Sequence, residues 1–247
     1  MSEILLRQRL DDLAAQGKSV RLWLRDDDAV EPSDPLETLL ALVRRFQIPV
    51  TLAVIPEPTG AALAGLLRPE TLATIAVHGW NHQSHAGPGE KKQELGGHRP
   101  AAIVLDELRQ GLAKLRGLYG EQLLPMLVPP WNRIDKALLS SLPGLGFTTL
   151  SVFGREKRGA VLALLNTHVD VMDWRGTRGG RDADILFAEL AAYLEPEAEP
   201  LQAIGILTHH LVHDQTVWDF LTRLFALTVT HPACCWESAR TLLQRQA

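Results

Sequence analysis

Two histidines and a run of three aspartates are the residues of this chain whose types and spacing could do chemistry. His78 and His82 stand four residues apart in the segment His-Gly-Trp-Asn-His. If this segment made one helical turn, the spacing would present both imidazoles to the same metal ion. A catalytic metal commonly takes a carboxylate as its third ligand and keeps an open position for water. The run Asp26-Asp27-Asp28 can supply that carboxylate.

The aspartate run needs compensation, because neighbouring carboxylates repel one another and are costly to bury uncompensated. A divalent cation together with Arg25 can supply it. One carboxylate on the metal, with its neighbour free to take a proton from water, is a workable arrangement for hydrolysis. The alternative is a solvated acidic turn that leads into a helix N-terminus, where acidic residues are also favoured.

A second histidine pair, His209-His210, follows the apolar run Ile-Gly-Ile-Leu-Thr. Burial lowers the pKa of a histidine and a neighbouring carboxylate raises it, so such a residue can be held ready as a general acid. Because side chains alternate along a strand, we expect only one of the two to point inward. The histidines other than His78, His82 and His209 are interpreted as surface or structural residues.

These groups follow strands in a chain that alternates β and α segments, which implies a parallel sheet. We expect strands at 20–24, 49–55, 74–77, 126–128, 148–152, 164–170 and 203–208. We expect helices at 3–15, from 35 onward, and at 100–118, 136–142, 182–193, 217–227 and 236–244. Functional side chains of parallel α/β folds collect at the carboxyl ends of strands, and the polar clusters of this chain fall there. The pattern alone leaves open a closed barrel or an open doubly wound sheet.

In their order along the chain, these clusters resemble the five motifs of the polysaccharide deacetylase superfamily, the NodB-like carbohydrate esterases. The resemblance spans about residues 20–215. The matching residues are Asp27-Asp28, His78 with His82, Pro129-Pro130-Trp131, Asp170 with Asp173 and Trp174, and Leu207-Thr208-His209. The resemblance implies a distorted (β/α)7 barrel and a divergent, cytoplasmic branch of the superfamily.

The resemblance also implies a metal centre and a general base. Asp28, His78 and His82 would hold one divalent metal ion, typically zinc, and Asp27 would activate the attacking water. A shift of one residue in the aspartate run, with Asp26 as base and Asp27 as ligand, is the alternative.

For the rest of the reaction, the resemblance implies an acid and an oxyanion site. His209 would protonate the leaving amine, and Asp170 would hold and tune it. The backbone N–H of Trp131, together with the metal, would stabilise the oxyanion. His210 in place of His209 remains the alternative acid.

Two positions depart from the family pattern. An arginine that often precedes the third motif, where it pairs with the base, is Val128 in this chain. Arg25 or Arg133 can substitute for it. The Ser or Thr usual after the first histidine of the second motif is Gly79.

Composition sets the class of protein around this site. The 247 residues have 46% hydrophobic side chains and a formal net charge of -4, which argues against disorder and against a nucleic-acid binder. No apolar run approaches the length of a membrane span, and the adjacent pair Cys234-Cys235 fits a reducing compartment. We therefore expect one cytoplasmic catalytic domain over residues 1–247, with no nucleic-acid or membrane partner.

The function that follows is removal of an N-acetyl group from an N-acetylated sugar or oligosaccharide by a metal-dependent hydrolase. One alternative is a metal hydrolase that acts on a non-sugar C–N bond. Another is a catalytically silent barrel that binds carbohydrate, which the absence of arginine at position 128 would favour.

Overall fold

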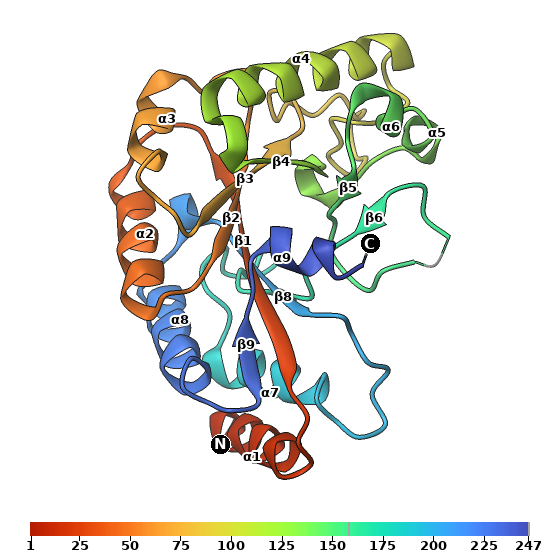
Figure 1. Ribbon diagram of the computed structural model, residues 1–247. Helices are drawn as coiled ribbons and strands as arrows, with labels where there is room; N and C mark the ends of the chain where they lie inside the picture. Colours follow the sequence, from red (N-terminus) through yellow and green to blue (C-terminus); the bar gives the residue numbers. More distant parts are fainter. Residues whose placement is uncertain (158, 247) are drawn as a thin grey trace.

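The computed structural model describes residues 1–157 and 159–246, which form a curled sheet of parallel strands with helices along its outer side (Figure 1). The strands are β1 (Val20–Ala29), β2 (Val50–Val54), β3 (Ala73–His78), β4 (Leu123–Val128), β5 (Thr149–Leu150), β6 (Ala163–Leu164), β7 (Val169–Asp170), β8 (Ile204–Thr208) and β9 (Cys234–Trp236). Their order in the sheet is β6-β5-β4-β3-β2-β1-β8-β7, and β9 pairs with the start of β1.

The segment 163–170 links the two edges of this sheet. Its first part, β6, pairs with β5, and its last part, β7, pairs with β8. Between them, Thr167 forms a parallel bridge with Phe153. The curled sheet is therefore a distorted (β/α)7 barrel, which confirms the predicted fold and decides against an open doubly wound sheet.

The helices are α1 (Ser2–Ala15), α2 (Asp34–Phe46), α3 (Ala61–Leu67), α4 (Ala101–Tyr119), α5 (Lys136–Leu139), α6 (Leu142–Leu145), α7 (Ala183–Ala192), α8 (Gln215–Thr228) and α9 (Ala239–Gln244). Helix α2 shows how the sequence builds this layer. Ser33 caps its first turn by accepting a hydrogen bond from the N–H of Leu36, and leucines at helical spacing bury one face. In the described part of the chain, no helix is both long and apolar enough to cross a membrane.

Strand β1 separates two apolar cores because its side chains alternate between the two faces of the sheet. Leu22 and Leu24 pack in the large core between the strands and the helices. Trp23 packs in a smaller core inside the barrel, with Met126 of β4. Leu242 of α9 belongs to this inner core, so the last helix covers the end of the barrel opposite the carboxyl ends of the strands.

The structure corrects four of the predicted elements. The expected strand at 164–170 is divided into β6 and β7, which pair with opposite edges of the sheet. Strand β1 continues to Ala29, so the aspartate run lies within the strand and not after it. The strand can continue because each carboxylate of the run finds a partner, as described below. The expected helix at 236–244 begins only at Ala239, since residues 234–236 pair with β1 as β9. The expected helix at 136–142 is divided into α5 and α6, and Ser141 and Pro143 mark the break.

Candidate active site

The polar clusters meet around one cavity of about 650 Å³ at the carboxyl ends of the strands. Asp27 and Asp28 come from β1, and His78 is the last residue of β3. Trp131 follows β4, and His209 follows β8. The full lining is Asp27, Asp28, His78, His82, Lys92, Trp131, Asn132, Arg133, Phe153, Asp170, Trp174, Arg175, Arg178 and His209. Every site residue proposed from the sequence is in this list.

Asp28, His78 and His82 lie within reach of a single ion. Each offers one ligand atom, and these atoms lie within 4.8 Å of one another. The Oδ1 atom of Asp28 is 3.0 Å from Nε2 of His78 and 3.3 Å from Nε2 of His82. Burial raises the pKa of Asp28, but the hydrogen bond from His78 and the nearby imidazoles outweigh it and leave this pKa lowered. The carboxylate is therefore held in the ionised form that a metal ligand needs.

The loop between His78 and His82 is shaped by Glu94, a buried residue that the sequence interpretation did not single out. Its carboxylate accepts hydrogen bonds from the backbone N–H groups of Trp80, Asn81 and His82, at 2.8, 3.0 and 3.1 Å. The segment does not make the helical turn on which the spacing argument was conditional. The segment is an irregular loop in which Gly79 and His82 have φ of 60° and 57°, and Glu94 satisfies the N–H groups. Burial raises the pKa of Glu94, although these N–H donors oppose the shift.

Gly79 is required by this loop. A Cβ atom at this position would lie 2.4 Å from Oε2 of Glu94 and 2.6 Å from Cγ of Pro130. Its φ of +60° also lies in the left-handed region that favours glycine. The departure from Ser or Thr noted in the sequence therefore has a steric cause.

Asp27 is held by Arg25, which lies two residues earlier on the same face of β1. The Nε atom of Arg25 is 2.9 Å from Oδ1 of Asp27, and Nη2 donates to Oδ2 at 3.1 Å. Arg25 also donates to Ser151 at 2.7 Å and to Asn132 at 2.8 Å, and its side chain is fully buried. Arg25 thus supplies the cation that Val128 cannot.

The other substitute that the sequence suggested for this cation, Arg133, has a different partner. Its Nη1 atom donates to the backbone carbonyl of Lys92 at 2.7 Å. Among the described residues, no ion pair joins Arg133 to Asp27. The ion pair of Asp27 is formed with Arg25.

Asp26 lies on the opposite face of β1, away from the cavity. Its carboxylate accepts hydrogen bonds from the hydroxyl of Thr208 at 2.7 Å, the backbone N–H of His210 at 2.9 Å and Nδ1 of His210 at 2.5 Å. Asp26 and His210 are both buried. This geometry favours the register in which Asp27 and Asp28 serve the site, and it favours His209 over His210 as the acid.

The His209 side chain lines the cavity, and the residues around it fix its position. The ring packs edge-on against Trp174, with ring centroids 4.7 Å apart. Its backbone N–H donates to Nε2 of His213 at 3.2 Å. Burial lowers the pKa of His213 to about 4, so His213 stays neutral and can accept this hydrogen bond.

Asp170 reaches His209 through Trp174. Its carboxylate accepts hydrogen bonds from the backbone N–H of Met172 at 3.0 Å and from the indole N–H of Trp174 at 2.8 Å. Burial raises the pKa of Asp170, and the charge of His209 opposes that shift. Within residues 1–157 and 159–246, no hydrogen bond joins Asp170 directly to His209; Nδ1 of His209 is buried without a partner.

Trp131 has a backbone conformation that side chains rarely adopt, with φ of 55°. Asn132 follows with φ of 56°. Strain of this kind persists where the surroundings enforce it and is frequent at functional sites. In the described part of the chain the N–H of Trp131 donates to no partner, whereas the next N–H donates to Pro129. The Trp131 ring lies against His82, with centroids 4.3 Å apart.

Solved structures share this architecture. The chain is similar to a protein assigned as a polysaccharide deacetylase from Mycobacterium smegmatis, with a TM-score of 0.67, 17% identity and coverage of 93% of this chain and 90% of that one. It is similar to a peptidoglycan deacetylase from Bacillus subtilis, with a TM-score of 0.59, 15% identity and coverage of 93% and 92%. It is also similar to an acetyl xylan esterase from Clostridium thermocellum in complex with cobalt, with a TM-score of 0.56, 14% identity and coverage of 92% and 91%.

The chain has the polysaccharide deacetylase fold. No family model matches the sequence, and no curated protein matches it significantly. The structural similarity therefore shows the fold. The sequence identities are too low to identify the substrate.

Asp173, a residue of the fourth motif, does not line the cavity and has a structural role. The Asp173 carboxylate accepts hydrogen bonds from the backbone N–H groups of Gly176 and Thr177, at 3.0 and 2.9 Å. Asp173 thus organises the loop that follows β7, whereas Asp170 and Trp174 of the same motif line the cavity.

Proposed function

We propose that residues 1–247 form one catalytic domain, a metal-dependent hydrolase that removes an N-acetyl group from an N-acetylated sugar or oligosaccharide. The observation that carries the proposal is that Asp27, His209 and the set Asp28, His78 and His82 line one cavity. Amide hydrolysis needs a base, an acid and an electrophile at one site, and this cavity offers a group for each.

The residues present fit a divalent metal ion. The Nδ1 atom of His78 lies 2.9 Å from the carbonyl oxygen of Val128, which can only accept, so Nδ1 carries the hydrogen. With a hydrogen on Nδ1, the 3.0 Å contact between Nε2 and the Asp28 carboxylate needs either a second proton on the ring or a metal ion, and a divalent ion bound by both atoms would take the place of that proton. Burial lowers the pKa of His82, which favours the neutral ring that a metal binds.

We propose Asp28, His78 and His82 as the ligands and zinc as the ion, because zinc suits two imidazoles and a carboxylate. When bound, a divalent ion lowers the pKa of a water molecule and polarises the amide carbonyl. The chain's own groups then handle the protons and orient the substrate.

Asp27 is the proposed general base. Its carboxylate is fixed by the two contacts to Arg25, so its remaining acceptor positions keep one direction relative to the cavity. A base fixed in this way can accept the proton of the attacking water without first losing side-chain entropy.

His209 is the proposed acid for the leaving amine. Trp174 packs on its ring and His213 holds its backbone N–H, so the imidazole faces the cavity in one orientation. The unpartnered N–H of Trp131 is the proposed donor to the oxygen that becomes negative in the transition state.

The test is acetate release from a panel of N-acetylated sugars, chitooligosaccharides and small non-sugar amides, with zinc-loaded protein. We expect activity on a sugar and loss of about 10²-fold or more in Asp27→Asn, the range typical of general-base catalysis. Asp219→Asn, an exposed site on α8, is the matched control. Activity confined to the non-sugar amides, or equal behaviour of Asp27→Asn and wild type, would contradict the proposal.

We also propose a cytoplasmic location. Cys234 and Cys235 are adjacent free thiols, which suits a reducing compartment. A cytoplasmic enzyme would meet soluble sugars before cell-wall polymers. Fractionation of the source cells followed by immunodetection tests this, and recovery in an extracellular fraction would contradict it.

A further inference from the structure

We propose that the substrate carries an anionic group, a phosphate or a carboxylate, which binds a cationic rim around the cavity. The rim is defined by Lys92, Arg133, Arg175 and Arg178, all of which line the cavity. This inference rests on the proposed function, because it names the substrate class of the same site.

The charge of the rim differs from that of the whole chain. The protein has a formal net charge of -4, yet four cationic side chains gather at one mouth. The arginine ion pairs of the described residues all involve other arginines. Inside the cavity, Asp27 is neutralised by Arg25, and Asp28 lies against His78 and His82. The third carboxylate of the lining, Asp170, accepts hydrogen bonds from the N–H of Met172 and the indole of Trp174. The rim arginines therefore have no ion-pair partner among the described residues.

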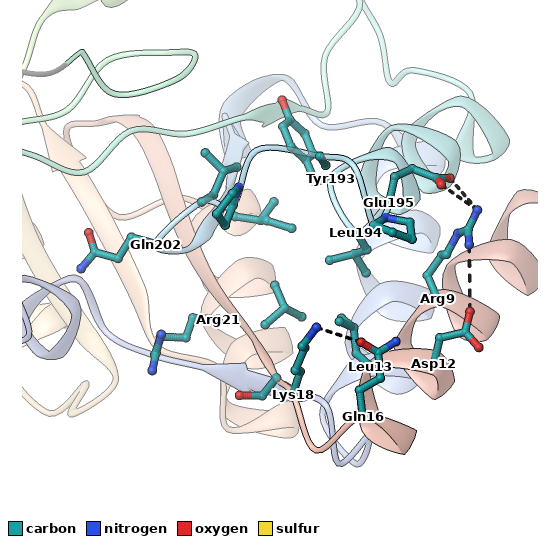
Figure 2. Close-up of a pocket in the computed structure, with 17 residues that line it drawn as sticks. Arg9, Asp12, Leu13, Gln16, Lys18, Arg21, Tyr193, Leu194, Glu195 and Gln202 are labelled. Atoms are coloured by element: carbon teal, nitrogen blue, oxygen red, sulfur yellow. Dashed lines mark hydrogen bonds and ion pairs between the residues drawn. The ribbon is translucent and has the colours of Figure 1, made fainter.

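A second hollow shows the contrast. It measures about 480 Å³ and lies between α1 and the segment that follows α7 (Figure 2). There Arg9 donates to both carboxylate oxygens of Glu195, at 2.8 and 2.7 Å, and Arg21 pairs with Glu237. Arginines of this hollow thus have carboxylate partners within the chain, whereas those of the rim are available to a ligand.

The loop that carries two of the rim arginines is built to hold one shape. The N–H of Arg178 donates to the carbonyl of Asp173, and the N–H of Asp173 donates to Gly179, both at 2.9 Å. The N–H of Gly180 donates to the Asp214 carboxylate at 2.9 Å. Arg178 itself has φ of 60°, a strained conformation for a side-chain-bearing residue. A loop ordered in advance loses less entropy when it binds a ligand.

The other half of the rim comes from two segments that hold each other. Arg133 donates to the backbone carbonyl of Lys92, and the Lys92 ammonium lies 5.9 Å from the centre of the Trp131 ring. Arginine suits phosphate and carboxylate because its planar group can donate two parallel hydrogen bonds.

Aromatic side chains complete the recognition surface. Trp131, Trp174 and Phe153 line the same cavity, and Trp174 and Phe153 are 46% and 44% exposed. Exposed aromatic rings can pack on the apolar face of a sugar ring. The combination fits a sugar with an N-acetyl group at the metal and an anionic group at the rim.

The test compares N-acetylglucosamine with its 6-phosphate and with N-acetylmuramic acid, which carries a carboxylate. We expect kcat/KM to favour one charged sugar by about tenfold or more, the worth of a charge-assisted hydrogen bond, mainly through KM. Comparison of the 6-phosphate with N-acetylmuramic acid decides between phosphate and carboxylate. The double variant Arg175→Gln/Arg178→Gln should reduce this preference toward unity, and added salt should weaken it.

The matched control is Arg7→Gln/Arg68→Gln, which removes an exposed arginine of α1 and the exposed C-cap arginine of α3, both without an ion pair among the described residues. It should keep the full preference for the charged sugar. Equal kcat/KM for charged and uncharged sugars, or a preference that survives in the rim variant, would overturn the inference.

Equilibrium binding separates the inference from the proposed function. Calorimetry with glucosamine 6-phosphate and with glucosamine requires no turnover. If glucosamine 6-phosphate binds more tightly than glucosamine, and the rim variant loses this difference, the inference is supported. The absence of acetate release from every sugar would then contradict only the proposed function. Acetate release without any preference for charge contradicts the inference alone.

Discussion

Arg25 and Asp27 are neighbours on one face of a single strand, and they form a two-point contact inside the barrel, Nε to Oδ1 at 2.9 Å and Nη2 to Oδ2 at 3.1 Å. The base and its cationic partner thus come from the same three-residue stretch, not from two strands. Val128, where the superfamily often places its arginine, is free to pack in the inner core.

The first prediction concerns this contact. Arg25→Lys keeps the charge but cannot hold both carboxylate oxygens, so Asp27 loses its fixed direction. We expect kcat to fall about 10²-fold with little change in KM, because the contact matters for proton transfer more than for binding. Arg99→Lys is the control, since Arg99 forms a comparable two-point pair with Glu107. Equal kcat in the two variants would sink the role assigned to Arg25.

A second prediction concerns the metal. The purified protein should contain close to one equivalent of zinc or a similar ion, measured by plasma mass spectrometry. His78→Ala/His82→Ala should abolish it, while His98→Ala, at a histidine paired with Glu90, should not. Because a ligand bound only to the folded state stabilises it, chelation should lower the Tm of wild type and leave the double variant unchanged. Full occupancy in the double variant is the contrary result.

A third prediction tests the loop that carries these histidines. Gly79→Ala places a Cβ against Glu94 and Pro130 at a positive φ, so we expect a loss of about 2–4 kcal/mol in the free energy of unfolding. Metal affinity should fall with it, because the loop sets the position of His82. Gly117→Ala, in the exposed face of α4 where a Cβ meets nothing, should instead add about 0.5–1 kcal/mol. Urea unfolding measures both, and similar effects at the two glycines would contradict the steric argument.

A fourth prediction separates the aspartates of β1. Asp26→Asn breaks a buried pair with His210 and should cost about 3–5 kcal/mol of stability while the metal remains bound at neutral pH. Asp28→Asn should have the opposite profile. It should lose the metal, whereas in the presence of chelator its free energy of unfolding should stay close to that of wild type. Measuring zinc content and urea midpoints of both variants decides the register, and metal loss in Asp26→Asn alone would reverse it.

A fifth prediction concerns pH and stability. Burial lowers the pKa of His213 to about 4, with Asp26 and Asp214 opposing this shift and His210 and His209 adding to it. In the unfolded chain the pKa of this histidine is about 6.5. Between pH 6.5 and pH 4, the unfolded state therefore binds a proton at His213 that the folded state does not bind. This contribution is fully present above pH 6.5 and is lost as pH falls toward 4, by about 3 kcal/mol at most.

His213→Gln removes this contribution. The free energy of unfolding of the variant should therefore fall less steeply than that of wild type between pH 6.5 and 4, as urea titrations at several pH values can show. His98→Gln, which removes an exposed imidazole from another part of the chain, is the comparison variant for the loss of a histidine. Parallel pH profiles of wild type and His213→Gln would contradict the buried neutral state.

Periodicity predicted a parallel sheet because buried parallel strands are nearly continuous apolar runs, as in β2 and β3, whereas the barrel was implied by the family resemblance. It also predicted which clusters meet, since parallel strands bring their carboxyl ends to one side. It failed at β9, where a three-residue strand has too few residues to show a period. The continuation of β1 through the aspartates was missed because propensity counts carboxylates as turn formers and cannot include their buried partners.

Within the site, residue types and the family resemblance together predicted candidate ligands, a candidate base and a candidate acid, and the structure brings all of these side chains to one cavity. The supporting groups were not predictable. Glu94 is one glutamate in a charged segment, and its role depends on three backbone N–H groups that lie 12 to 14 residues away. The choice of Arg25 over Arg133 likewise depends on which face of the barrel each side chain occupies.

Strand β1 places different chemistry on its two faces, with Arg25 and Asp27 toward the cavity and Asp26 toward His210. Side chains alternate along β1 as far as Asp27, before the irregular register at Asp28. Inserting or deleting one residue before Arg25 would therefore exchange the two sets and bury their charges against the wrong partners. This stretch should therefore diverge among descendants of the chain by substitution alone, at constant length.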